Sequence, residues 1–291
     1  MAALTVLPEP AGLSPDDAHA LAQAYDLLER PSFAARVSSL IGAPLAQGFK
    51  LLPRTWQVQI NRASDRAMSD ALDVATHSLH RAGPAGMSDR TSAIGLGALA
   101  GFIGLPALAI ELPLTTVVLL RAIAREAAAQ GEDLDGIDAR LACMEVFVLG
   151  SPNEADDDAD LGFFELRAAS AVHFARAGVP LIAAGEPGLP ATVALVRSLG
   201  RRFGIVVGEK AAAQAVPLFG AAAGAGINAL FFHHFTDIAR GHFTVRRLER
   251  TYGASAVQAA YESLHAAASR ARHEAFAQSH AARRASREPS W

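Results

Sequence analysis

Two long apolar segments, both rich in glycine and alanine, limit what this chain can fold into. The first, Ser92 to Leu120, has Glu111 as its only charged residue, and the second, Ala211 to Phe232, has none. Each segment is long enough to cross a bilayer, which needs about 20 residues. The free energy of inserting the first segment is near zero, because Glu111 costs about 2.5 to 3.5 kcal/mol and the apolar side chains of the segment contribute roughly −4 kcal/mol. The second is less apolar still, so we expect neither segment to be a stable transmembrane span.

Each apolar segment contains two glycines that are four residues apart. Gly97 and Gly101 lie in the first segment, and Gly220 and Gly224 in the second. This spacing places both glycines on one side of a helix, where the missing side chains let another backbone come close. We therefore expect the two segments to pack against each other. The alternative is that the glycines reflect only a composition rich in small residues.

Prolines inside these segments predict broken helices. Pro106 and Pro113 interrupt the first segment near its middle, and Pro217 enters the second early. A proline inside a helix removes a backbone hydrogen bond. A re-entrant or surface-docked pair of broken helices therefore fits better than two straight spans.

Two polar residues inside the apolar segments need hydrogen-bond partners. Asn228 lies one helical turn beyond Gly224 and on the same side of its helix, so we hypothesise a contact between Asn228 and Glu111. A structural hydrogen bond is favoured over an ion or proton path.

The rest of the chain has the three- and four-residue spacing of amphipathic helices. The clearest runs from Trp56 to Leu79, and Ser14 before Pro15 marks the start of an earlier helix. Further helices are expected over 114–130, from a cap at Asp138, and over 160–177, 190–202, 209–232, onward to 250, and 254–280; only 204–207 reads as β. The prediction is an all-α, multi-helix bundle around the central pair of broken Gly/Ala-rich helices. Residues 14–280 form one domain, and 281–291 a disordered, arginine-rich tail.

Composition and charge favour an intracellular protein that works at a surface. The single cysteine, Cys143, excludes an intrachain disulfide and indicates a reducing compartment, and the chain's start lacks a signal-peptide pattern. Between Glu132 and Glu165 the chain has eleven acidic residues and one arginine, whereas from Phe231 onward it has nine arginines and five acidic residues. Such polarity can orient a protein at an anionic surface or let two faces of one fold attract each other.

A basic group follows the second apolar segment. Its arginines suit phosphate head groups, because guanidinium forks match phosphate oxygens and neighbouring phenylalanines can enter acyl chains. The alternative is a solvated helix face in which these arginines pair with Glu249 and Asp237. The predicted lipid- or phosphate-binding residues are Arg240, Arg246, Arg247 and Arg250.

The same region holds a set of residues with a weak metal-binding pattern. His233 and Asp237 are one turn apart, and Gly241 is expected to turn the chain before His242. The favoured reading of His233 and His234 is a buried, hydrogen-bonded histidine. The metal alternative would use His233, His234, Asp237 and His242. No catalytic residue and no cofactor are predicted, and nucleic acid is not an expected partner.

The chain resembles the EcsC family. The resemblance rests on the passages GEKAAAQAVPLFGAAAGAGINALFFHHFTDIARGHFTVRRLERTYG and IGLPALAIELPLTTVVLLRAIAREAAAQGEDL, and covers roughly residues 50 to 265. It implies a link to membrane transport and carries no catalytic residue.

These observations favour a non-enzymatic, membrane-associated accessory protein that supports transport or a lipid process. We expect it in the cytoplasm, peripheral to or partly inserted in the membrane, with an anionic membrane surface or a membrane protein as its partner. Two alternatives stay open: a soluble carrier or sensor of an apolar ligand such as a fatty acid, and a metal-dependent hydrolase. The oligomeric state is not predicted.

Overall fold

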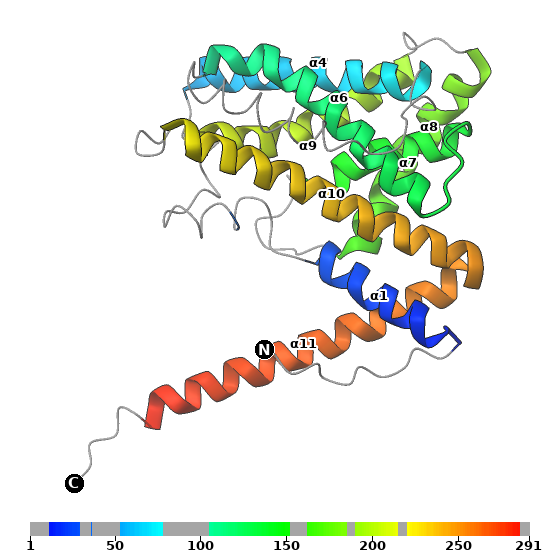
Figure 1. Cartoon of the computed structure of the whole chain (residues 1–291), viewed down its shortest axis with the longest axis vertical. Helices are drawn as coiled ribbons and strands as arrows, with labels where there is room; N and C mark the ends of the chain where they lie inside the picture. The colour runs from blue at the N-terminus through cyan, green and yellow to red at the C-terminus, as the bar shows by residue number, and fades with distance from the viewer. Residues whose placement is uncertain are drawn as a thin grey trace. The chain divides into compact units, whose positions relative to one another are not determined.

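The computed structural model confirms the all-α prediction. It describes residues 12–29, 36, 53–77, 105–151, 162–184, 190–214 and 220–285, and these form eight helices and no strand (Figure 1). The helices are α1 (Pro15–Leu28), α4 (Arg54–His77), α6 (Leu105–Ala129), α7 (Ile137–Leu149), α8 (Phe163–Ala184), α9 (Pro190–Gln214), α10 (Gly220–Tyr252) and α11 (Ala254–Ala285).

The chain divides into two compact units, 27–243 and the two ends, 1–26 with 244–291. The single domain predicted over 14–280 therefore includes parts of both units. Each unit is described by itself. Helix α10 contributes residues to both. Residues 281–285, which were assigned to the disordered tail, are helical, since α11 continues to Ala285.

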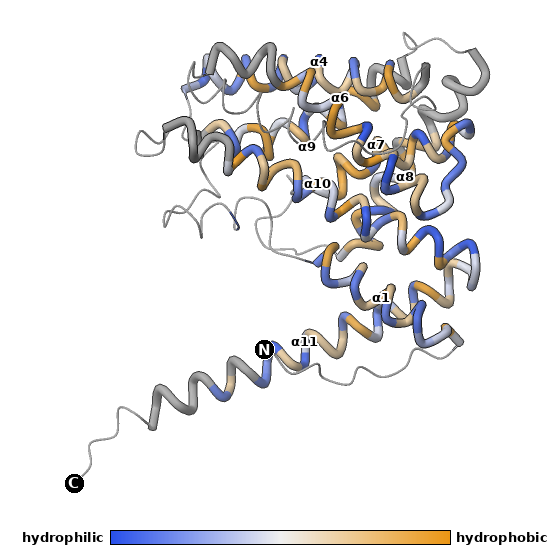
Figure 2. Tube along the Cα trace, in the orientation of Figure 1, coloured by the Kyte–Doolittle hydropathy of each residue, from blue (hydrophilic) through white to orange (hydrophobic). Residues whose placement is uncertain are grey.

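In the larger unit, α4 packs against both α6 and α9, and α7 contacts α4, α6, α8 and α9. Hydrophilic and hydrophobic residues alternate along α4 (Figure 2), as expected of an amphipathic helix. Its buried side matches the predicted stripe, with Ile60, Ala63, Ala67 and Ala71 in the core, whereas Trp56 is 36% exposed.

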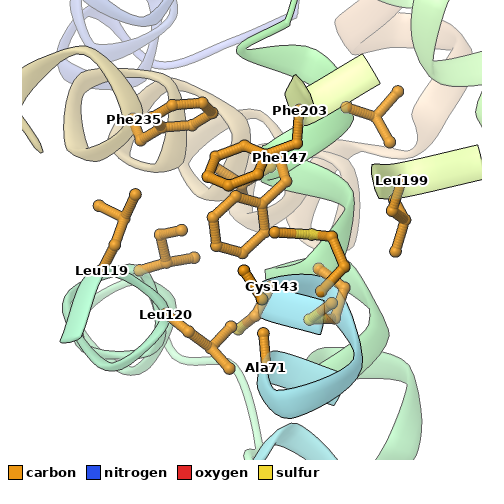
Figure 3. Packing of buried hydrophobic residues seen from close by; sticks show 14 of the residues in the cluster. Ala71, Leu119, Leu120, Cys143, Phe147, Leu199, Phe203 and Phe235 are labelled. Carbon is orange, nitrogen blue, oxygen red and sulfur yellow. The ribbon is translucent and has the colours of Figure 1, made fainter. Parts of the chain in front are cut away.

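Aromatic rings form the centre of this core. Phe147 of α7 stacks edge-to-face on Phe203 of α9, with ring centroids 5.3 Å apart, and Phe235 of α10 lies within 5.7 Å of both rings (Figure 3). Such pairs add roughly 0.5 to 1.5 kcal/mol beyond burial. Cys143, a free cysteine, is fully buried beside them.

The smaller unit joins α1, the end of α10 and the start of α11. Tyr25 of α1 contacts Tyr261 of α11 with a ring distance of 5.1 Å. The Ser14 hydroxyl accepts a hydrogen bond from the Asp17 backbone, which confirms Ser14 as the N-cap of α1.

Several predicted boundaries were wrong. Helix α6 continues through Pro113 instead of breaking there, and α10 continues through Gly241. The stretch predicted as β, 204–207, is part of α9, because the whole helix packs on α4 and burial outweighs β propensity. Gly136, rather than Asp138, occupies the N-cap of α7. Pro217 lies outside the described residues.

Candidate functional site

Two of the four predicted lipid-binding arginines are occupied by carboxylates of the protein itself. In the larger unit, Arg240 donates to both carboxylate oxygens of Glu126, over 2.8 and 3.2 Å. This pairing raises the pKa of Arg240. A fork held by two hydrogen bonds is less available to a phosphate.

In the smaller unit, Arg247 donates to Asp17 over 2.9 Å, and the Tyr252 hydroxyl donates to the same carboxylate over 2.8 Å. The hydrogen bond from Tyr252, followed by that from Arg247, lowers the pKa of Asp17. Arg246 is partly buried and Arg250 is exposed, and both have interactions of their own. Arg247 therefore contributes to the packing of α1 on the end of α10, whereas Arg240 bonds to α6.

The predicted metal ligands do not gather around one point. His234 contacts the Gly150 carbonyl oxygen through Nε2 at 2.7 Å, and its burial lowers the pKa of the ring. His242 Nε2 lies 3.7 Å from a Glu145 oxygen instead. Within the described ranges, no three His, Cys, Asp or Glu side chains could hold a metal ion. This agrees with the reading of His234 as a buried, hydrogen-bonded histidine.

A buried polar cluster joins three helices of the larger unit. Glu145 of α7 accepts a hydrogen bond from the Ser170 hydroxyl of α8 over 2.7 Å and faces His242 of α10. All three side chains are buried. The carboxylate of Glu145 lies between the serine and the histidine. The His242 ring therefore does not contact the Ser170 hydroxyl, as a general base must. The cluster can hold the three helices together, but it is not a hydrolase triad.

A second buried polar feature lies near the end of α9. Glu209 is 5% exposed, and its Oε2 has no hydrogen-bond partner among the described residues. Burial raises the pKa of Glu209 to about 7. The neighbouring Lys210 is fully buried with its ammonium 5.1 Å from the centre of the Phe231 ring.

The glycines predicted to join the apolar segments remain a prediction. Gly97 and Gly101 lie outside the described residues, and Gly220 and Gly224 form the first turns of α10. Asn228 is 1% exposed, as expected of a buried polar residue. Glu111 lies on α6, and nothing described bears on its contact with Asn228.

The close helix contact that the structure does describe is between α9 and α4. A Cβ added to Gly200 would lie 3.1 Å from the Asp65 backbone and closer still to its carboxylate. At Gly204 it would meet the Asn61 side chain at 3.2 Å. Gly204 follows Gly200 in α9, whereas its neighbour Asn61 precedes Asp65 in α4, so the two helices are antiparallel. Gly200 and Gly204 have the same four-residue spacing as the two glycine pairs selected from the sequence, so the same pattern could have predicted this contact.

Arginines surround this contact and form what we term the cationic face: Arg62 of α4 with Arg197 and Arg201 of α9. All three are exposed. Arg197 and Arg201 act electrostatically on Asp65, which lies three residues after Arg62. Desolvation raises the pKa of Asp65, and the two arginines oppose that shift.

Exposed apolar side chains lie at the N-terminal end of α4. Val58 is 48% exposed, and Arg54, Val58 and Arg62 follow one another at one-turn spacing. Trp56, two residues before Val58, is on the opposite side of α4, in line with the buried Ile60 and Ala63. Arg66, also exposed, is 4.0 Å from Asp70. Arginine and valine side chains along one side of a helix suit a membrane interface.

The model of the EcsC protein family matches residues 19–248. The chain belongs to the EcsC protein family. No curated protein and no solved structure matches it significantly.

The EcsC match contains all of α4, α6, α7, α8 and α9, and therefore the whole cationic face and the Glu145 cluster. It ends before α11. Among the helices described for this EcsC protein, none combines the length and hydropathy needed to cross a membrane.

Proposed function

We propose that this EcsC protein is a peripheral accessory protein that binds an anionic membrane surface through the cationic face, at the cytoplasmic side, in support of transport or a lipid process. The observation that carries the proposal is the exposure of Arg62, Arg197 and Arg201 at the contact of α4 with α9, together with the exposed Val58 one turn before Arg62. Anionic lipids attract arginines by about 1 kcal/mol each, and apolar side chains add affinity when they enter the interface.

The cationic face suits this role better than the arginines predicted from the sequence. Arg240 and Arg247 already bind Glu126 and Asp17. Among the described residues, Arg197 and Arg201 make no hydrogen bond or ion pair within 4 Å. Their guanidinium groups are therefore available to lipid phosphates.

The test is sedimentation of the full chain with vesicles of phosphatidylcholine alone or mixed with phosphatidylglycerol, at low salt. We expect binding to the anionic vesicles only, weakened by salt. The double variant Arg197→Gln/Arg201→Gln should bind about 30-fold less tightly, since two contacts of about 1 kcal/mol are lost.

The matched control is Arg270→Gln/Arg272→Gln, which removes the same charge from exposed positions of α11. It should bind nearly as well as the wild type. Absence of binding by the wild type, or an equal loss in both double variants, would reject the proposal.

A further inference from the structure

The cationic face contains a carboxylate. This group would not strengthen the binding of a ligand that carries only negative charge. Asp65 is partly buried against Gly200 of α9, and Arg197 and Arg201 act on it electrostatically. Among the described residues it forms no hydrogen bond or ion pair within 4 Å. A negative charge here repels phosphate, so the face presents two kinds of charge to a ligand.

The glycine contact fixes where this carboxylate lies. Gly200 comes three residues after Arg197 and one before Arg201, so both arginines flank the notch that receives Asp65. Arg62 lies one turn before Asp65 on α4. The two packed helices therefore hold Arg197 and Arg201 within electrostatic reach of one carboxylate, with Arg62 one turn away from it along α4.

From this arrangement we infer that the cationic face binds the head group of an aminophospholipid, with the phosphate on Arg197 and Arg201 and the ammonium on Asp65. The inference rests on the proposed function. A phosphoethanolamine head group carries one anion and one cation joined by a two-carbon link. Its charges complement the arginine and aspartate pattern, and guanidinium groups bind phosphate through paired hydrogen bonds.

The chemistry of the cation selects ethanolamine over choline. A primary ammonium donates three hydrogen bonds and can bind a carboxylate directly, whereas a quaternary ammonium donates none and is recognised by aromatic rings. The N–H donors of ethanolamine are therefore the feature that this face recognises.

The test compares two vesicle types with equal phosphatidylglycerol content, one completed with phosphatidylethanolamine and the other with phosphatidylcholine. We expect the wild type to bind the ethanolamine vesicles about fivefold more tightly, as one partly exposed ion pair allows. Asp65→Asn should lose this preference and bind the choline vesicles at least as well as the wild type. Soluble glycerophosphoethanolamine should compete for the wild type better than glycerophosphocholine does.

The control is Asp73→Asn, an exposed aspartate two turns further along α4, which should keep the preference. Equal binding of the wild type to both vesicle types, or a preference that persists in Asp65→Asn, would overturn the inference and leave the proposed function standing. No binding to either vesicle type would overturn both.

Discussion

At the scale of single residues, Glu209 combines deep burial with a carboxylate oxygen that has no hydrogen-bond partner among the described residues. Most buried carboxylates in proteins are paired, since an isolated charge in the interior is costly. Glu209 responds with a pKa raised to about 7, so it is largely protonated in the folded protein below that pH. The ordinary value is 4.5, and the unfolded chain ionises there.

This difference gives the stability a direction with pH. Between about 4.5 and about 7 the unfolded state releases the proton of Glu209 before the folded state does, so stability falls as pH rises through this window. The shift corresponds to a loss of about 3 kcal/mol. In Glu209→Gln this loss should be absent, which chemical denaturation at pH 4.5 and pH 8 would measure.

The control for this experiment is Glu262→Gln on α11, where the carboxylate is exposed. It should reproduce the pH profile of the wild type. If Glu209→Gln and the wild type lose the same stability between the two pH values, the assignment to Glu209 is wrong.

At the scale of helices, the approach of α9 to α4 depends on two glycines to different degrees. Gly200 faces the Asp65 backbone, whereas Gly204 faces the end of a flexible Asn61 side chain. A rigid neighbour cannot move away from an added methyl group as a side chain can.

Gly200→Ala should therefore destabilise the protein by about 1 to 3 kcal/mol, and Gly204→Ala by less. Gly226→Ala serves as the matched control, because nothing lies within 4 Å of a Cβ there and the site is within α10. Alanine at 226 should stabilise its helix by about 0.5 to 1 kcal/mol. Thermal unfolding of the three variants checks the order, and a Gly200→Ala variant as stable as Gly226→Ala would contradict it.

At the scale of the whole molecule, the two units differ in what holds them together. The larger unit has a core of aromatic rings around Phe147. The smaller unit combines the Tyr25 and Tyr261 contact with polar bonds at Asp17. Because Asp17 has a lowered pKa, its contribution to stability is present above the ordinary value of 3.8 and is lost as pH falls through the lowered one.

Asp17→Asn should loosen the smaller unit at neutral pH by roughly 1 kcal/mol, since the ion pair is partly exposed. Hydrogen exchange should become faster in α1 and stay unchanged in α4 and α9. Asp16→Asn, at the exposed neighbouring position, is the control. Unchanged exchange in α1 of the Asp17 variant would show that these bonds contribute nothing.

Local patterns predicted the helices and some of their ends, but not the partners of the charged residues. The Ser14 cap and the end of α6 near residue 130, followed by Gly131 with φ 78°, depend on neighbouring residues in the sequence and were predicted. Pro113 was expected to break a helix that tertiary packing keeps whole.

The candidate site was harder to predict, because its geometry comes from residues far apart in the sequence. Arg240 and Glu126 are 114 positions apart, and nothing in their local sequence indicates the pairing. The cationic face likewise requires the register of α4 against α9, which the spacing of Gly200 and Gly204 suggests only after their partner helix is known.

The Asp17 contacts bear on how the protein is made. The carboxylate and Arg247 are separated by 230 positions, so the ribosome must complete all of the larger unit before α1 can meet its partners. During translation at about 5 to 20 residues per second, roughly ten seconds or more pass before Tyr25 of α1 can contact Tyr261 of α11. A chaperone that shields a nascent amphipathic helix would act on this chain at that stage.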